Sequence, residues 1–306
     1  MGTRLTAFRD FWKTLEDAEQ QPPIPPQLPP GRVEMVPGRG EVFVREIPGR
    51  PDQPTILLLH GWTLTADVNW FTAYDTIARH GRVLAMDQRG HGRGLRSDET
   101  FTLDAAADDA AGLLRHLDAG PAIIVGYSMG GSVGLVQSRR HPETVAGLVL
   151  QSTGLQWRAN LRERVLWTGM AAVEYGLRFG TPRGLTDRYL RMAVEQRPDL
   201  EPHLPWLKAE VQRGDPSNIA AASRALSAFD ARPFAGSIDV PAVVVISRQD
   251  RLIRSRRQRE LVAALRGAQS VEVDAAHNGW MVKPEEVAGA LDEAISMVAA
   301  RIAANC

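Results

Sequence analysis

The segment Gly126-Tyr127-Ser128-Met129-Gly130 constrains the fold of this chain more than any other. A short apolar run over residues 122–125 precedes it, and the small residues over 130–134 are typical of a helix start. The order strand, sharp turn, helix predicts a strained backbone at Ser128, with a glycine on each side to make room. We therefore expect the hydroxyl of Ser128 to stand at the top of a sheet as a nucleophile. The alternative is a glycine-rich turn with an incidental serine.

Apolar runs that alternate with helical patterns surround this turn. Residues 42–46 alternate like an edge strand, whereas residues 55–59 form the continuous apolar run of a strand buried on both faces. This alternation predicts an α/β fold with a parallel sheet that helices cover on both sides. Besides these two strands, the pattern predicts strands over 82–86, 122–125, 146–150, 240–246 and 270–273, and helices over 71–79, 102–118 and 284–303.

The α/β pattern is interrupted between residues 155 and 236. This segment contains helical stretches and scattered aromatic residues, without a convincing strand. We interpret it as a helical insertion into a core formed by residues 33–154 and 237–306. The aromatic residues Trp157, Trp167 and Trp206 either line an apolar pocket or form the interior of the insertion itself.

An N-terminal segment, residues 1–32, precedes the predicted core. Residues 4–20 can form an amphipathic helix, and residues 22–30 contain six prolines, which predicts a stiff extended connector. We expect the helix to dock on the rest of the protein, with weak contact to a membrane surface as the alternative.

The charge balance, the cysteine count and the lack of long apolar runs narrow the expected partners and location of the protein. The 306 residues carry 36 basic and 36 acidic side chains, so nothing favours nucleic acid as a partner. The single cysteine, Cys306, cannot form an internal disulfide. Without an apolar run of 18 residues or a signal-peptide pattern, we expect a cytoplasmic protein, or one peripherally bound to a membrane.

A serine nucleophile needs a base, and three histidines follow Ser128. His141 lies at the end of the helix that starts at the nucleophile, and His203 lies in the insertion, where a structural role is favoured. His277 follows the last predicted strand, in a loop that can face the serine. His277 is therefore the expected base, and His60, which precedes the serine, is expected to be structural.

The carboxylate that orients the base should also follow a strand. Asp250 meets this requirement, whereas the residues after the preceding strand, 151–153, offer no carboxylate. Asp274 lies too close to His277 in sequence for the needed geometry, and Asp239 precedes its strand. We therefore expect Asp250 to orient His277.

Acyl transfer also needs donors for the negative oxygen that develops in the transition state. One is expected to be the backbone N–H of Met129, directly after the nucleophile. The second is expected from the loop after residues 55–59, where Gly61 lets the backbone turn and Trp62 supplies its N–H.

These residues resemble the α/β-hydrolase superfamily from about residue 40 to the C-terminus. Four blocks match in order: His60-Gly61-Trp62, Asp87–Gly92, the segment around Ser128, and the loops of Asp250 and His277. The first and third look most like bacterial esterases and the cofactor-free haloperoxidase-like or perhydrolase group. The resemblance implies an eight-stranded, mostly parallel sheet with a helical cap, and an oxyanion hole at Trp62 and Met129.

The resulting hypothesis is a serine hydrolase that cleaves a carboxylic ester or thioester with Ser128, His277 and Asp250. The expected partner is a small-molecule or lipid-like acyl substrate, with no cofactor and no metal. Relatives that use an aspartate nucleophile, such as epoxide hydrolases and haloalkane dehalogenases, are disfavoured by Ser128. A carbon–carbon bond hydrolase or lyase with the same triad remains an alternative, as does a non-catalytic ligand-binding member of the fold.

Overall fold

The computed structural model describes residues 23–158, 190 and 193–305. The amphipathic helix predicted over residues 4–20 and the position of Trp167 lie outside these residues. No helix in the described ranges is long and apolar enough to cross a membrane.

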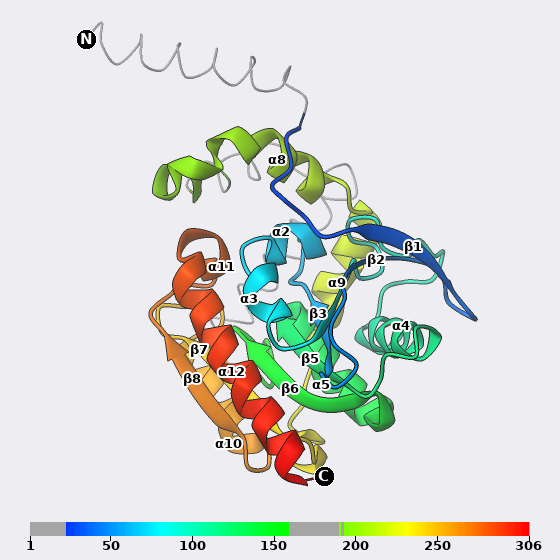
Figure 1. Ribbon diagram of the computed structural model, residues 1–306, viewed down its shortest axis with the longest axis vertical. Helices are drawn as coiled ribbons and strands as arrows, with labels where there is room; N and C mark the ends of the chain where they lie inside the picture. The colour runs from blue at the N-terminus through cyan, green and yellow to red at the C-terminus, as the bar shows by residue number, and fades with distance from the viewer. Residues whose placement is uncertain (1–22, 159–189, 191–192, 306) are drawn as a thin grey trace, which may run out of the picture.

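One eight-stranded sheet forms the centre of the molecule, in the order β1-β2-β4-β3-β5-β6-β7-β8 (Figure 1). The first two strands pair antiparallel with each other, β2 pairs antiparallel with β4, and the remaining pairs are parallel. The predicted α/β sheet is therefore confirmed. The strands are β1 (Gly31–Val36), β2 (Gly40–Ile47), β3 (Thr55–Leu59), β4 (Arg82–Met86), β5 (Ala122–Tyr127), β6 (Val145–Gln151), β7 (Ala242–Ser247) and β8 (Gln269–Val273).

Helices cover both faces of this sheet, because alternate residues of the buried strands point to opposite sides. Leu57 and Leu59 of β3 pack in one cluster with α4, α5 and α10, whereas Ile56 and Leu58 pack in a second cluster with α2, α3 and α12. In Figure 1, α12 crosses one face and α4 lies on the other. The helices of the core are α2 (Ala66–Trp70), α3 (Tyr74–Ala78), α4 (Leu103–His116), α5 (Met129–Arg140), α10 (Ser255–Ala264), α11 (Gly279–Val282) and α12 (Pro284–Asn305).

One local prediction is wrong, and another holds only in part. The strand predicted at the sheet edge, residues 42–46, belongs to β2, which is paired on both sides because β1 forms the edge. The helical stretch predicted over residues 71–79 is shorter than expected: α3 lies within it, and a separate helix, α2, precedes it. Thr65 caps the start of α2, with its Oγ1 accepting a hydrogen bond from the N–H of Val68 at 3.1 Å.

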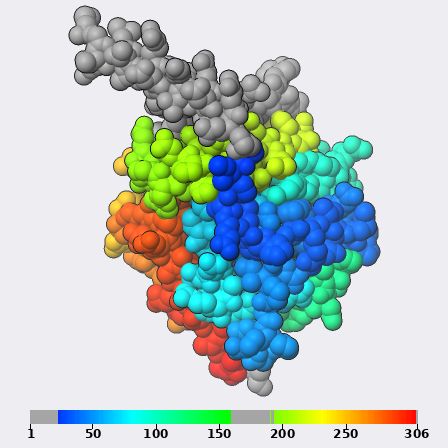
Figure 2. Space-filling model, turned by 45° about the horizontal axis from the view of Figure 1, so that its top comes forward, coloured from blue at the N-terminus to red at the C-terminus, as the bar shows by residue number. Residues whose placement is uncertain are grey.

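The described part of the insertion contains the helices α8 (Leu204–Gln212) and α9 (Pro216–Ala228), preceded by a short 3₁₀ helix over Pro198–His203. The ends of the insertion lie side by side, since Gln156 and Asp230 form an isolated β-bridge. The N-terminal connector runs against the α8 segment (Figure 2), where the His203 ring contacts the carbonyl oxygen of Ile24 at 2.9 Å.

Candidate active site

Ser128 occupies the turn between β5 and α5 in a backbone conformation that side chains rarely adopt. Its φ is 54° and its ψ is −113°, as the glycine-flanked sequence predicts. Its N–H donates to the carbonyl oxygen of Gln151, at the end of the neighbouring strand, at 2.9 Å. This bond ties the strained turn to the sheet and holds Ser128 beyond the end of β5.

The glycines beside Ser128 make room for tight backbone packing. A Cβ added at Gly130 would lie 2.0 Å from the carbonyl oxygen of Leu59, and one at Gly126 would lie 2.5 Å from the carbonyl oxygen of Gly130. Real Cβ atoms do not approach backbone so closely. The start of α5 is therefore pressed against the end of β3, which brings Ser128 close to the loop that follows β3.

Ser128, His277 and Asp250 lie in one chain of hydrogen bonds. The Oγ of Ser128 lies 3.2 Å from Nε2 of His277, and Nδ1 of His277 lies 2.7 Å from Oδ2 of Asp250. With an ionised Asp250, Nδ1 carries the hydrogen and donates it, so that Nε2 is left to accept the proton of the hydroxyl. The three residues come from the ends of three different strands, β5, β7 and β8.

Asp250 is fixed on both oxygens. Its side chain is fully buried, and Oδ1 accepts hydrogen bonds from the N–H groups of Leu252 and Ile253, both at 2.8 Å. Its other oxygen accepts from His277. A carboxylate held in this way can orient the imidazole and stabilise its protonated form.

The other histidines and carboxylates weighed in the sequence lie elsewhere. His141 caps the C-terminal end of α5 and contacts Asp108 at 2.7 Å. Asp274 is exposed and pairs with Arg248 at 3.0 Å, and Asp239 is exposed at the opposite end of β7. With His203 held against the N-terminal connector, these residues are not part of the hydrogen-bonded chain.

His60 has the structural role expected of it. Its Nδ1 donates to the carbonyl oxygen of Gly61 at 2.8 Å, and its Nε2 accepts from the N–H of Gln88 at 2.9 Å. Burial lowers the pKa of His60 to about 4, so the ring is neutral at pH 7. His60 thus joins the loop after β3 to the loop after β4.

The loop after β3, residues 60–65, approaches Ser128 with its backbone held by side chains. Gly61 uses its N–H to donate to Oδ1 of Asn69, at 2.9 Å, which fixes the backbone just before Trp62. The indole Nε1 of Trp62 donates to the carbonyl oxygen of Ile219 in α9, at 2.8 Å. The loop is therefore connected to the inserted segment as well as to the core.

A buried cluster of charges joins α8 to the core. Glu210 of α8 accepts a hydrogen bond from Arg93 at 3.1 Å, and the same guanidinium pairs with Asp67 at 2.7 Å and Asp87 at 3.2 Å. Burial raises the pKa of Asp87 and of Glu210, against the opposing effect of the charge on Arg93. The block Asp87–Gly92 that the sequence singled out therefore lies at the junction of the core and the inserted segment.

Sequence analysis missed two polar residues that support this site. Tyr127 donates a hydrogen bond from its hydroxyl to the carbonyl oxygen of His277, and Gln258 of α10 contacts the loop of Asp250. Tyr127 lies inside the motif that was recognised, but nothing in its type or spacing identifies a partner 150 residues away. Gln258 carries no signal beyond being a polar residue in an amphipathic helix.

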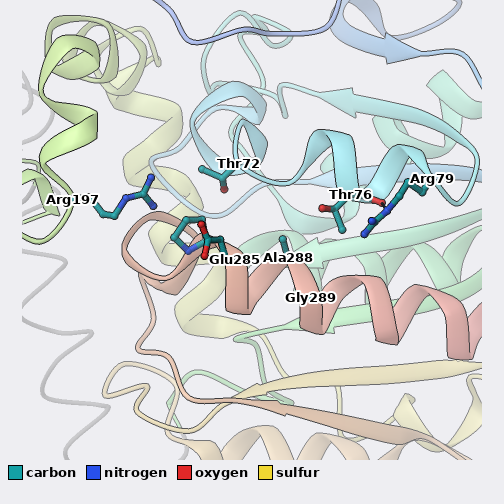
Figure 3. A pocket seen from close by; sticks show the side chains of 8 residues that line it. Thr72, Thr76, Arg79, Arg197, Glu285, Ala288 and Gly289 are labelled. Atoms are coloured by element: carbon teal, nitrogen blue, oxygen red, sulfur yellow. Dashed lines mark hydrogen bonds between the residues drawn. The ribbon is translucent and has the colours of Figure 1, made fainter.

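A separate cavity of about 480 Å³ lies between α3, the start of α12 and Arg197 (Figure 3). Two arginines line it, but each is already paired: Arg79 with Asp292 at 3.0 Å and Arg197 with Asp199 at 2.7 Å. Since Glu285 also lines the cavity, its charges are balanced and it does not favour an anion.

Comparison with known proteins finds relatives of this chain and solved structures with a similar fold. The chain is 28% identical over 267 residues to a pimeloyl-[acyl-carrier protein] methyl ester esterase of Neisseria meningitidis, covering 82% of each chain. It is 37% identical over 106 residues to a bifunctional esterase/perhydrolase of Acinetobacter calcoaceticus, covering 34% of this chain and 38% of the relative. The crystal structure of an enol-lactonase from Burkholderia xenovorans superimposes with a TM-score of 0.75 at 25% identity, over 87% of this chain and all of the other.

The family model of the alpha/beta hydrolase fold matches residues 54–284, which include β3 to β8 and all three residues of the hydrogen-bonded chain. The match covers well over half of the sequence, and the names of the two relatives given above both include an esterase. This chain belongs to the α/β-hydrolase fold family and is a hydrolase.

Proposed function

We propose that the protein cleaves a carboxylic ester or thioester with Ser128 as nucleophile, His277 as general base and acid, and Asp250 as the residue that orients His277. The observation that carries this proposal is the continuous hydrogen-bonded chain from Ser128 to Asp250. Its order and its position at the carboxyl ends of the strands are those required for activating a serine.

In the first half of the reaction, His277 Nε2 removes the proton of Ser128 as the Oγ attacks the carbonyl carbon of the substrate. The protonated His277 then gives this proton to the leaving oxygen or sulfur, and the acyl group remains on Ser128. In the second half, His277 takes a proton from water as its oxygen attacks the acyl carbon. The protonated His277 then returns this proton to the Oγ of Ser128 as the bond between Oγ and the acyl carbon breaks, which releases the acid and restores the enzyme. Asp250 stabilises the positive charge on His277 in both halves.

The negative oxygen of each tetrahedral intermediate is assigned to the N–H groups of Trp62 and Met129. Met129 is the first residue of α5, so its N–H also lies at the positive end of the helix dipole. The fixed position of Gly61, whose N–H is used by Asn69, supports Trp62 as the second donor.

We assign the inserted segment 155–236 to a cap that shapes the substrate site. The support comes from α8 and α9, which adjoin the loops after β3 and β4 through Glu210 and Ile219. The esterase names of the relatives favour an oxygen ester over a thioester. The proposed substrate is thus a small or lipid-like acyl ester.

The decisive experiment compares p-nitrophenyl esters and acyl-thioesters of increasing chain length on the wild type and on Ser128→Ala. We expect Ser128→Ala to lose at least about a thousandfold in kcat/KM. The matched control is Ser138→Ala, a buried serine of the same helix whose hydroxyl donates to Gly134, and it should keep nearly full activity. Ester hydrolysis that survives Ser128→Ala would exclude the proposal, and faster turnover of a diketone than of any ester would favour the carbon–carbon hydrolase instead.

A further inference from the structure

Gln258 is fully buried in α10, and its amide contacts the loop after β7 at both of its ends. Its Oε1 accepts a hydrogen bond from the N–H of Ser247 at 2.9 Å, where the strand ends. Its Nε2 donates to the carbonyl oxygen of Ile253 at 2.7 Å, just before α10 begins. The same Nε2 lies 3.4 Å from Oδ2 of Asp250, between these two ends.

These contacts fix the orientation of the Gln258 amide and, through it, the loop. The oxygen must face Ser247 because only an acceptor can bind that N–H, so the NH₂ group must face Ile253 and Asp250. The N–H of Ile253 in turn holds Oδ1 of Asp250, at 2.8 Å. Gln258 therefore binds the carbonyl oxygen of Ile253, the residue whose N–H holds one carboxylate oxygen of Asp250, and also contacts the other oxygen directly.

We propose that Gln258 is a positioning residue for the hydrolytic reaction: it keeps Asp250 aligned with His277. The inference rests on the triad assigned above. His277 donates its hydrogen bond to Oδ2 of Asp250. A rotation of the Asp250 carboxylate would therefore turn the imidazole of His277 away from Ser128. Gln258 does not touch the substrate and acts through Asp250.

Among the charged groups that the structure describes near Gln258, Asp250 is the one that contacts its amide. The arginines on either side of it in α10 are engaged elsewhere, Arg257 with Glu260 and Arg259 with Glu272. From the neighbouring strand β7, Ser247 contributes its backbone only to this contact. His277 is one hydrogen bond further, beyond Asp250.

Two substitutions of similar size separate positioning from packing. In Gln258→Met, the volume is nearly kept while all polar contacts are lost, and we expect kcat to fall about 10- to 100-fold with KM within about twofold of the wild type. The control is Gln137→Met, which removes another fully buried glutamine, bound to Thr144 far along α5. It should leave kcat unchanged.

Gln258→Glu gives a pH signature that a packing role would not produce. When protonated, the new carboxyl can still donate to the carbonyl of Ile253, as the amide does. When it ionises, it faces that carbonyl and the carboxylate of Asp250, and the two negative charges repel. We expect the ratio of the kcat of Gln258→Glu to that of the wild type to approach one at low pH and to fall as pH rises.

The pH profile decides the question even if the methionine variant folds poorly, and the thermal midpoint of each variant is measured at each pH. The inference is overturned if the pH profile of Gln258→Glu parallels that of the wild type, or if any loss of kcat matches the loss of folded protein. It is also overturned if Gln258→Met is fully active while Ser128→Ala is inactive, a result that leaves the proposed function intact. Activity that survives Ser128→Ala would instead refute the proposed function itself.

Discussion

The hydroxyl of Tyr127 donates a hydrogen bond to the backbone carbonyl of His277, and the two rings lie 5.3 Å apart at an interplanar angle of 46°. Tyr127 directly precedes Ser128 in the chain. Its ring also fills the space beside Gly61, where an added Cβ would lie 2.7 Å from Cε1. One buried side chain, next to Ser128 in the chain, thus contacts both the loop of His277 and the loop after β3.

Tyr127→Phe should lower kcat about tenfold with little change in KM. The substitution keeps the ring but removes one buried hydrogen bond, worth about 1 to 1.5 kcal/mol, that positions the loop of His277. Steady-state kinetics on a short aryl ester measure this effect. Tyr74→Phe is the matched control, because its buried hydroxyl bonds to the carbonyl of Ala66, away from the triad. Equal activity of the two variants would contradict the role of Tyr127.

Asp250→Asn should reduce kcat by about a thousandfold or more. An amide can present its NH₂ group to Nδ1 of His277 and so favour the tautomer with the hydrogen on Nε2, which cannot accept the proton of Ser128. Asp274→Asn provides the comparison, since this exposed carboxylate lies three residues before His277 and pairs with Arg248. If Asp250→Asn keeps more than a tenth of wild-type kcat, another residue orients the base.

Glu210→Gln should stabilise the protein more at pH 8 than at pH 5. Burial raises the pKa of Glu210, so the native state binds this proton more tightly than the unfolded state does. The wild type therefore loses stability as pH rises through the folded-state pKa, and the glutamine, which is always neutral, does not. Thermal midpoints across this range should show a gap between the two proteins that widens with pH by about 2 °C. A gap that narrows as pH rises would show that the charge on Glu210 is net stabilising.

His91→Gln should protect the protein against acid. Burial, followed by the proximity of His60, lowers the pKa of His91 to about 3. The unfolded chain, with a pKa near 6.5, then takes up a proton that the native state refuses, so stability falls with pH below that value. By pH 5.5 this costs about 1.4 kcal/mol. Urea unfolding at pH 7.5 and 5.5 should show the variant gaining this amount relative to the wild type; a constant difference would argue against it.

The features predicted well from the sequence are those with a local signal. The apolar runs of β3 and β5 are long enough to identify buried strands, and the glycines around Ser128 have a close backbone contact that only glycine permits. The candidate triad followed because strand ends in a parallel sheet meet at one edge, which leaves few positions for a base and an acid.

The features that were missed depend on contacts between distant residues. The edge strand β1 alternates charged residues with Val33 and Met35, which are more than half exposed, so no buried pattern marks it. Its strand identity comes from pairing with β2. Likewise, Glu210 and Arg93 are 117 residues apart, and nothing in either segment indicates that their charges meet.

The bond from the Trp62 indole to Ile219 has a consequence for how such enzymes diversify. A recombinant that receives α9 from another hydrolase also receives a new neighbour for the loop expected to bind the oxyanion. Exchange of this helix should therefore alter turnover together with substrate preference, and selection for a new substrate would act on both at once. Substitutions in those parts of the inserted segment that do not touch this loop can change substrate preference without changing the turnover rate.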